Sequence, residues 1–190
     1  MSKKMLIKSL QQSPIVKKGS YFYVVHPITD GVPEISPGLL SEVTDEMGSQ
    51  LGKWMPFEKI VTMEAMGIPL ASALSLSMNI PFTIIRKRSY GLPGEHHVKQ
   101  QTGYSKNDLF INGLQKGDEV VIVDDVLSTG GTLKAVLHAL HTMGVTVKGV
   151  CIAVDKGMNC KRLTEETNVP IMSLVQIDVT ENTVQILNEK

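Results

Sequence analysis

Residues 120–132 read VVIVDDVLSTGGT and combine an apolar run, two acids and a loop of small residues. The first four residues are branched and apolar, which predicts a strand buried on both faces, as in a parallel sheet covered by helices. Asp124 and Asp125 stand where that strand is expected to end. Apolar residues then recur at helical spacing over residues 133–143, and Gly144 follows as the expected helix cap. The stretch therefore predicts a buried strand, an acid pair, a small-residue turn and a helix.

The loop that follows the two acids is suited to bind a phosphate. Its glycines let backbone N–H groups converge on one point, its hydroxyls add donors, and the next helix directs its positive dipole end there. Two ionised carboxylates would repel a phosphate unless they serve neighbouring sugar hydroxyls or a Mg²⁺ ion. A 5-phosphorylated ribose offers this combination. The loop is not a Walker A motif, because the chain contains no G-x-x-x-x-G-K-[ST].

This stretch resembles the motif that binds phosphoribosyl pyrophosphate (PRPP) in the type I phosphoribosyltransferases. In that family the acid pair holds the ribose hydroxyls and the next loop holds the 5-phosphate. The resemblance implies that Asp124 and Asp125 are catalytic residues and ligands of Mg²⁺. It places the phosphate on the residues that come next, which are Val126, Leu127, Ser128, Thr129, Gly130, Gly131 and Thr132.

The length and composition favour a globular protein of the cytoplasm. A chain of 190 residues suits one domain, and 19 basic against 19 acidic residues give no charge excess for nucleic acid or a membrane surface. No run of about 18 apolar residues predicts a membrane span. Cys151 and Cys160 give no disulfide framework, and the N-terminus has no signal peptide pattern.

Strands and helices alternate after residue 58. Residues 59–64 and 81–86 read as strands on either side of a helix at 67–78, which predicts a parallel βαβ unit. Further strands are expected at residues 146–154, 169–177 and 184–187, with a short helix at 160–167. We therefore predict an α/β fold with a mainly parallel sheet flanked by helices.

The first 58 residues have less parallel-sheet character and are expected to supply a hood. Their patterns predict a helix at 3–12, a strand at 21–26, a loop at 28–38 and a helix at 39–54. The whole chain, 1–190, is predicted to be a single domain. It comprises a hood with N-terminal helices (1–58), a core (59–190) and a small C-terminal contribution to the hood.

The turn after the strand at 59–64 reads Glu64-Ala65-Met66-Gly67. It is expected at the carboxyl edge of the sheet, where ligands bind in such folds. The resemblance places the pyrophosphate loop here, and the adenine-type enzymes carry a similar Glu-Ala-x-Gly. Those enzymes have an arginine where this chain has Met66.

The segment 86–111 is basic and poor in apolar side chains, and it is longer than a simple connection between two strands requires. It predicts a flexible loop at 87–110 that meets an anion. The resemblance implies that Arg86 and Lys87 stabilise the departing pyrophosphate and that Tyr104 is a catalytic-loop tyrosine. Gly103 replaces the glutamate expected before that tyrosine.

Lys156 follows the strand at 146–154, where an ammonium group can donate to a carbonyl. In 6-oxopurine members of the family a lysine here contacts the purine O6, whereas adenine would present an amino donor. The pattern is most similar to the archaeal-type hypoxanthine phosphoribosyltransferases. It implies purine salvage, in which PRPP and hypoxanthine or guanine give IMP or GMP and pyrophosphate. Ser128 stands where many 6-oxopurine enzymes have an aspartate, so no proton acceptor is assigned.

Other functions stay open at this point. The same chemistry on adenine or xanthine is one alternative, and a non-catalytic PRPP-sensing regulator is another. A regulator would need a DNA-binding module, which the acidic stretch at 42–46 disfavours. An orotate enzyme is disfavoured by the context of Lys156. The family usually dimerises, so the resemblance implies a homodimer that binds PRPP and a purine base.

Overall fold

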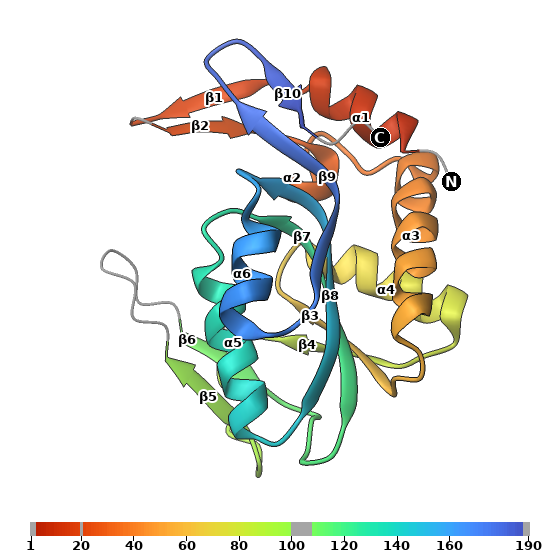
Figure 1. The fold of residues 1–190 in the computed structure, drawn as a ribbon, viewed down its shortest axis with the longest axis vertical. Helices are drawn as coiled ribbons and strands as arrows, with labels where there is room; N and C mark the ends of the chain where they lie inside the picture. Colours follow the sequence, from red (N-terminus) through yellow and green to blue (C-terminus); the bar gives the residue numbers. More distant parts are fainter. Residues whose placement is uncertain (1–2, 20, 100–107, 188–190) are drawn as a thin grey trace.

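The computed structural model describes residues 3–19, 21–99 and 108–187. A six-stranded sheet forms its centre, in the order β10-β9-β8-β7-β3-β4 (Figure 1). Its strands are β3 (Lys59–Met63), β4 (Phe82–Ile85), β7 (Glu119–Leu127), β8 (Thr146–Lys156), β9 (Ile171–Val179) and β10 (Val184–Ile186). All neighbours pair in parallel except β10, which runs antiparallel to β9. The predicted α/β fold with a mainly parallel sheet is confirmed.

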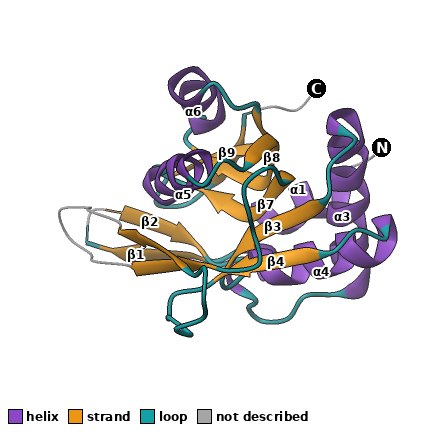
Figure 2. Cartoon of the chain, turned by 90° about the horizontal axis from the view of Figure 1, so that it is seen from below, coloured by secondary structure: helices purple, strands orange, loops and turns teal. Residues whose placement is uncertain are grey.

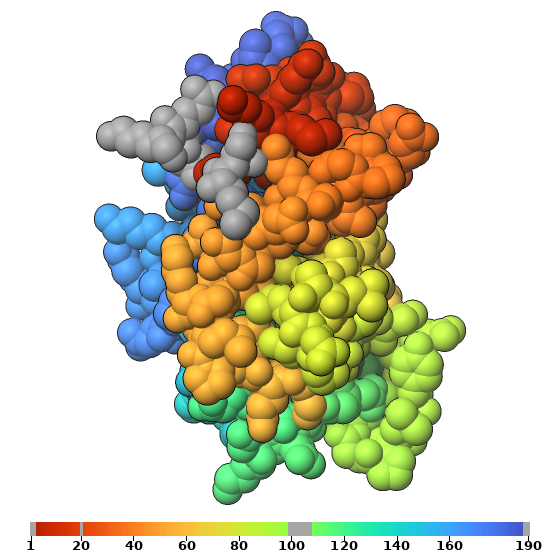
Figure 3. All heavy atoms as spheres, turned by 90° about the vertical axis from the view of Figure 1, so that its right-hand side faces the viewer, coloured from red at the N-terminus to blue at the C-terminus, as the bar shows by residue number. Residues whose placement is uncertain are grey.

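Helices cover both faces of the sheet, as Figures 1 and 2 show from two sides. One face carries α3 (Pro37–Leu51) and α4 (Gly67–Met78), and the other carries α5 (Gly131–Thr142) and α6 (Asn159–Thr167). Val121 and Val123 of β7 enter the core on the first side, and Val120 and Ile122 enter the core on the second. The branched run is thus buried on both faces, as predicted. From outside, α3 and α4 lie side by side (Figure 3).

A smaller layer, which we call the hood, stands beyond the carboxyl ends of the parallel strands (Figure 1). It contains α1 (Lys4–Gln11), the hairpin of β1 (Ile15–Lys18) and β2 (Tyr21–Val24), the one-turn α2 (Pro27–Asp30) and β10. Helix α1 contacts β10, and β2 contacts β9. Both ends of the chain therefore build the hood, as predicted. No helix in the described part of the chain is long and apolar enough to cross a membrane.

Several element bounds differ from the sequence-based expectation. The prediction that the central strand ends before the acid pair is wrong, because Asp124 and Val126 pair with Ile152 and Val154 of β8. The first residues of the predicted loop at 28–38 belong to α2. Strand β1 was not predicted. Helix α3 and the short helix η1 (Gly52–Trp54) cover the residues expected to be helical at 39–54. Helix α3 packs against the central sheet and α4, and it also contacts α1 of the hood.

The segment predicted as a flexible loop, 87–110, contains regular structure in part. β5 (His96–Lys99) and β6 (Asp108–Ile111) form an antiparallel pair, which a bridge between Arg86 and Phe110 joins to the end of β4. Glu95 organises the turn before β5 by accepting hydrogen bonds from Tyr90 N and Asn112 Nδ2, each at 2.9 Å. These hydrogen bonds, that of Asn112 first, lower the pKa of Glu95 to about 2. Tyr104 and Gly103 lie outside the described residues.

His26 ties the hood together. Its buried Nδ1 accepts from Ile28 N at 3.1 Å and so caps α2, while its Nε2 lies 2.8 Å from Ser9 Oγ of α1. A ring that accepts at Nδ1 carries its proton on Nε2, so Nε2 donates to Ser9. Burial lowers the pKa of His26 to about 4. The folded protein therefore contains His26 in its neutral form at neutral pH.

Acidification is expected to destabilise the protein through His26. Its pKa of about 4 in the folded state lies below the ordinary 6.5, so the unfolded chain takes up the proton first as the pH falls. The neutral ring contributes about 3 kcal/mol to the free energy of unfolding. This contribution is complete above pH 6.5 and is lost as the pH falls from 6.5 to 4. Denaturant unfolding across this range should show that the stability difference between wild type and His26→Gln shrinks toward pH 4. The variant His141→Gln, on the exposed side of α5, is the matched control, and a constant difference for His26→Gln would contradict this account.

Candidate functional site

Three adjoining pockets open at the carboxyl ends of the strands, beneath the hood. The loop pocket, about 150 Å³, lies over the turn between β7 and α5. The hood pocket, about 470 Å³, lies between the β1–β2 hairpin and the ends of β7, β8 and β9. The acid pocket, about 230 Å³, contains the acid pair together with Glu64 and Lys87. Val126 lines all three pockets and marks their junction.

The loop pocket has the form of an anion cradle. Gly130 adopts φ 81° at the start of α5, and a Cβ atom there would lie 2.4 Å from Leu163 Cδ1 of α6. Only glycine satisfies both the backbone angle and this close approach. Arg162 Nη2 donates to Thr129 O at 2.9 Å and holds the turn from the α6 side. The predicted phosphate residues are thus brought together around the start of a helix, where N–H groups and the dipole favour an anion.

The acid pair lies between the loop pocket and the acid pocket. Asp125 is only 8% exposed, and burial raises the pKa of both Asp124 and Asp125. The negative charge of Asp124 adds to the effect at Asp125, while the cation of Lys87 opposes it at Asp124. Two such carboxyl groups become fully ionised when hydroxyl donors or a cation come close, so their chemistry fits a ribose diol and Mg²⁺.

A metal ion at the acid pair would need further ligands from a bound substrate. In the described ranges, no group of three or more His, Cys, Asp or Glu side chains forms a metal site. Mg²⁺ prefers octahedral oxygen ligands and is commonly held by one or two carboxylates plus substrate phosphates. The acid pair therefore fits the protein share of such a site.

The two cations predicted to face a pyrophosphate lie in different places. Lys87 lines the acid pocket, whereas Arg86 lines a separate pocket on the outer side of β4. Arg86 Nε lies 2.5 Å from Glu64 Oε2, so the arginine neutralises the carboxylate that faces the acid pocket. The adjacent peptide bond, between Glu64 and Ala65, is cis. Arg86 thus acts on this pocket through Glu64.

The remaining residues of the predicted pyrophosphate loop have packing contacts. The Met66 side chain reaches the hood at Gly31. If Gly31 had a Cβ atom, that atom would lie 3.4 Å from Met66 Cε. A Cβ atom on Gly67 would lie 2.0 Å from Thr62 Oγ1 and 2.8 Å from Asp124 Oδ1. Glycine at position 67 therefore allows α4 to start against the acid pair.

Lys156 enters the hood pocket from the end of β8. Its Nζ donates to the backbone O of Phe22 at 2.5 Å and lies 3.7 Å from the centroid of the Tyr21 ring. Asp30 is the one carboxylate among the described residues that line this pocket. Its Oδ2 accepts from His26 N at 2.9 Å and from Thr29 Oγ1 at 2.6 Å.

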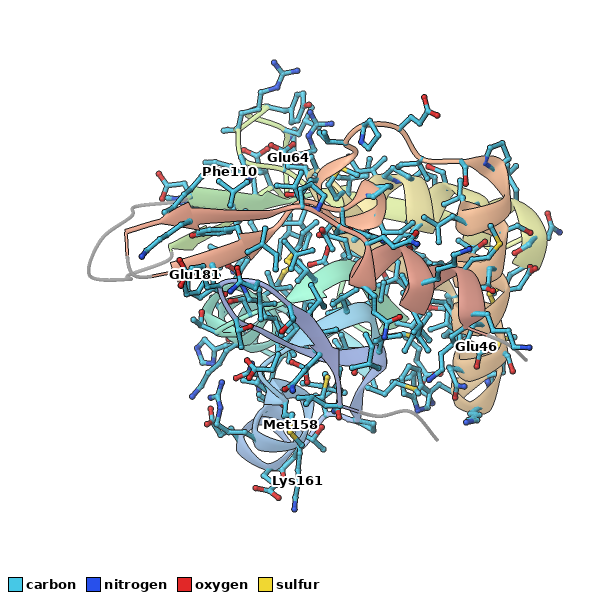
Figure 4. All side chains as sticks on the ribbon, turned by 90° about the horizontal axis from the view of Figure 1, so that it is seen from above. Glu46, Glu64, Phe110, Met158, Lys161 and Glu181 are labelled. Atoms are coloured by element: carbon cyan, nitrogen blue, oxygen red, sulfur yellow. The ribbon has the colours of Figure 1, made fainter. Side chains whose placement is uncertain are left out.

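The sequence interpretation missed the hood side of this pocket. The missed lining residues lie in the hood or on β8 and β9, and they are Leu10, Tyr21, Tyr23, Val24, Thr29, Asp30, Val154 and Ile177. The two-residue spacing of Tyr21 and Tyr23 in a predicted strand was a local signal of a shared face. Viewed from above, Glu64 and Phe110 lie on the opposite side of the molecule from Met158 and Lys161 on the α6 side (Figure 4).

Comparisons with known proteins agree with this geometry. The family model for the phosphoribosyl transferase domain matches residues 44–185. The hypoxanthine/guanine phosphoribosyltransferase of Ferroglobus placidus is 50% identical over 96% of this chain and 96% of its own length. The protein of the same name from Methanohalophilus mahii is 48% identical over 97% of this chain and 95% of its own length.

Solved structures share the fold at lower identity. The adenine phosphoribosyltransferase of Saccharomyces cerevisiae has a TM-score of 0.74 and 22% identity, over 90% of this chain and 97% of that chain. The adenine phosphoribosyltransferase of Rhodothermus marinus has a TM-score of 0.73 and 22% identity, over 92% and 97%. At this identity the likeness concerns the fold, because function depends on the residues of the site.

Proposed function

This chain belongs to the phosphoribosyl transferase domain family, and from this premise we propose that it is a hypoxanthine/guanine phosphoribosyltransferase of purine salvage. It transfers the phosphoribosyl group of PRPP to hypoxanthine or guanine, giving IMP or GMP and pyrophosphate. The observation that carries the choice of base is the ammonium group of Lys156 in the hood pocket. A donor at that place suits the O6 of a 6-oxopurine, whereas the amino group of adenine would leave it unpaired.

The three pockets supply a place for each part of the substrates. We assign the 5-phosphate to the loop pocket and the ribose hydroxyls to Asp124 and Asp125. The pyrophosphate is assigned to the acid pocket beside Lys87, and the purine to the hood pocket. Because Val126 borders all three, the ribose C1 would lie near the junction, with the base and the pyrophosphate on either side.

The reaction forms a bond from purine N9 to the ribose C1, breaks the bond from C1 to pyrophosphate, and releases the imidazole N–H proton of the purine to the solvent. The transition state carries positive charge on the ribose and growing negative charge on the leaving group. In this proposal Lys87, which lines the acid pocket, stabilises the leaving group, and Arg86 removes the repulsion that Glu64 would otherwise exert. When bound, Mg²⁺ would neutralise further charge on the pyrophosphate, held by the acid pair and substrate oxygens.

Two further roles follow from the surroundings of the base. The hood excludes water from the reacting C1, since hydrolysis of PRPP is the competing outcome. Asp30 is an acceptor for an N–H group of the purine, because it is a carboxylate fixed in the hood pocket.

We also propose, on the family resemblance, that the loop tyrosine Tyr104 completes the site and that the protein is a cytoplasmic homodimer.

A panel of bases tests this function. Purified protein, Mg²⁺ and PRPP are incubated with hypoxanthine, guanine, adenine, xanthine and orotate in turn, and nucleotide formation is followed. We expect kcat/KM for hypoxanthine or guanine to exceed that for adenine by about 100-fold or more, since a polar site rejects a mismatched donor strongly. Preferred turnover of adenine would show that the base assignment is wrong. Binding of PRPP without reaction of any base would favour the regulator instead.

A further inference from the structure

The β1–β2 hairpin of the hood closes around the one side chain assigned to read the base. The Lys156 ammonium donates to Phe22 O at 2.5 Å, and it lies 3.7 Å and 5.3 Å from the ring centroids of Tyr21 and Tyr23. Those two rings pack edge to face with centroids 4.6 Å apart. The ammonium of a half-buried lysine is thus enclosed by one carbonyl and two aromatic faces of the same hairpin.

A second contact fastens the same hairpin to the rest of the site. The Tyr21 hydroxyl lies 3.2 Å from Ser128 Oγ, and Ser128 lines both the loop pocket and the hood pocket. Tyr21 therefore borders the space assigned to the purine, and Phe22 O is linked to that space through its contact with Lys156. The hood pocket, about 470 Å³, lies within the usual range of small-molecule sites, about 300–1,000 Å³.

We propose that Phe22 O is an internal stand-in for the purine carbonyl, and that a 6-oxopurine binds by taking its place at Lys156. This inference rests on the proposed function and adds the step by which the base is admitted. In the free protein the Phe22 carbonyl satisfies the ammonium. When the base enters, O6 accepts from Lys156 Nζ, the hairpin contact opens, and the ammonium keeps one carbonyl partner throughout.

The exchange gives a physical reason for selectivity. A hydrogen bond to a charged group is stronger than one between neutral groups, and leaving the charged partner unsatisfied costs more than the bond itself is worth. A base with a carbonyl restores what the hairpin gives up. Adenine offers an amino donor at the same position, so it would have to open the hairpin without any replacement for Phe22 O. Selection therefore includes a penalty against the wrong base as well as a contact with the right one.

The Phe22 carbonyl can be observed alone by NMR. Tyr23 is the one tyrosine in the sequence that follows a phenylalanine, so ¹³C′-Phe and ¹⁵N-Tyr labelling yields a single carbonyl–amide peak for Phe22–Tyr23. Thr83 is likewise the one threonine that follows a phenylalanine. Adding ¹⁵N-Thr therefore supplies a control peak for Phe82–Thr83, which belongs to the outer pocket at β4. The Lys156→Met variant defines the Phe22 peak position when the ammonium is absent.

Saturating hypoxanthine is expected to move the Phe22 peak of the wild-type protein toward its position in Lys156→Met, with the Phe82 peak unchanged. Adenine at the same concentration is expected to leave the Phe22 peak in place. Calorimetry on the same samples establishes whether each base is bound. If hypoxanthine is bound and the Phe22 peak does not move, Lys156 keeps its hairpin partner and the exchange is refuted. If neither hypoxanthine nor guanine binds or reacts, the proposed function itself fails.

Discussion

Replacing Asp125 by asparagine is expected to remove most of the turnover and yet make the substrate-free protein more stable. Asp125 lies at the end of β7 with 8% of its surface exposed, and it faces the acid pocket beside Asp124. Asparagine keeps the shape of the side chain but not its charge. We expect kcat to fall by about 10²–10³-fold, the loss seen when one preorganised electrostatic group is removed from an active site.

The expected gain in stability follows from the raised pKa of the carboxyl group. Burial, together with the neighbouring Asp124, raises the pKa of Asp125 in the folded state above its ordinary value. The folded protein therefore holds the proton more tightly than the unfolded chain. The carboxyl group costs nothing at pH values below the ordinary value of 3.8, its cost grows as the pH rises from 3.8 toward the folded pKa, and the cost is constant above the folded pKa. Asparagine avoids this cost, so the free energy of unfolding should rise by about 0.5–2 kcal/mol at neutral pH.

Two measurements on one pair of variants test this expectation. Steady-state kinetics with PRPP and hypoxanthine give kcat, and denaturant unfolding at several pH values gives the stability. Asp178→Asn, at an exposed position of β9, is the matched control and should change neither quantity appreciably. A variant Asp125→Asn that keeps wild-type turnover would exclude the acid pair from the reaction. A gain in stability that does not shrink toward acid pH would exclude the buried charge as its cause.

Replacing Lys156 by methionine is expected to abolish the preference for 6-oxopurines. Methionine keeps most of the apolar stem that packs beside Tyr21, but it removes the ammonium group. A lost hydrogen bond from a charged donor corresponds to about 1.5–3 kcal/mol, so kcat/KM for hypoxanthine should fall by about 10- to 150-fold. Adenine loses no favourable contact, and its kcat/KM should stay constant or increase.

The informative quantity is the ratio of the two kcat/KM values. It is measured for wild type, for Lys156→Met and for Lys148→Met, a control on the same strand whose ammonium pairs with Glu119 at 3.3 Å. Lys148→Met is expected to leave the ratio at the wild-type value. An equal fall for both bases in Lys156→Met would mean that the lysine supports the hood without reading the base, because a structural loss does not discriminate between ligands.

The stretch VVIVDDVLSTGGT determined the centre of the molecule without tertiary information. The branched run of β7 predicted burial on both faces because side chains alternate along a strand and no polar residue interrupts either face. The glycine and hydroxyl turn predicted the anion cradle because its chemistry is local to the chain. The need for glycine at position 130 has a second cause, the approach of Leu163 from α6, which appears only in the folded structure.

The sequence alone placed the acid pair but not the end of its strand. Asp124 and Asp125 were expected after β7 because charged residues rarely continue a buried strand. The strand continues to Leu127 because β8 lies alongside and pairs with it, and that pairing is a contact between distant segments. Likewise, Arg86 was predicted to face a pyrophosphate, and its ion pair with Glu64 depends on how β4 lies beside β3.

What only the tertiary structure decided is the surroundings of the base. Lys156 was recognisable as a donor at a strand end, but its partners Phe22 O, Tyr21 and Tyr23 come from a hairpin more than a hundred residues earlier in the chain. Asp30 belongs to a one-turn helix whose position depends on the contact between His26 and Ser9. Periodicity and turn chemistry depend on residues that are neighbours along the chain. The hood, in contrast, is held together by packing between the N-terminal and C-terminal segments of the chain. The sequence therefore determined the fold and the turn that we assign to the phosphate, and the tertiary structure determined which side chains line the pocket that we assign to the base.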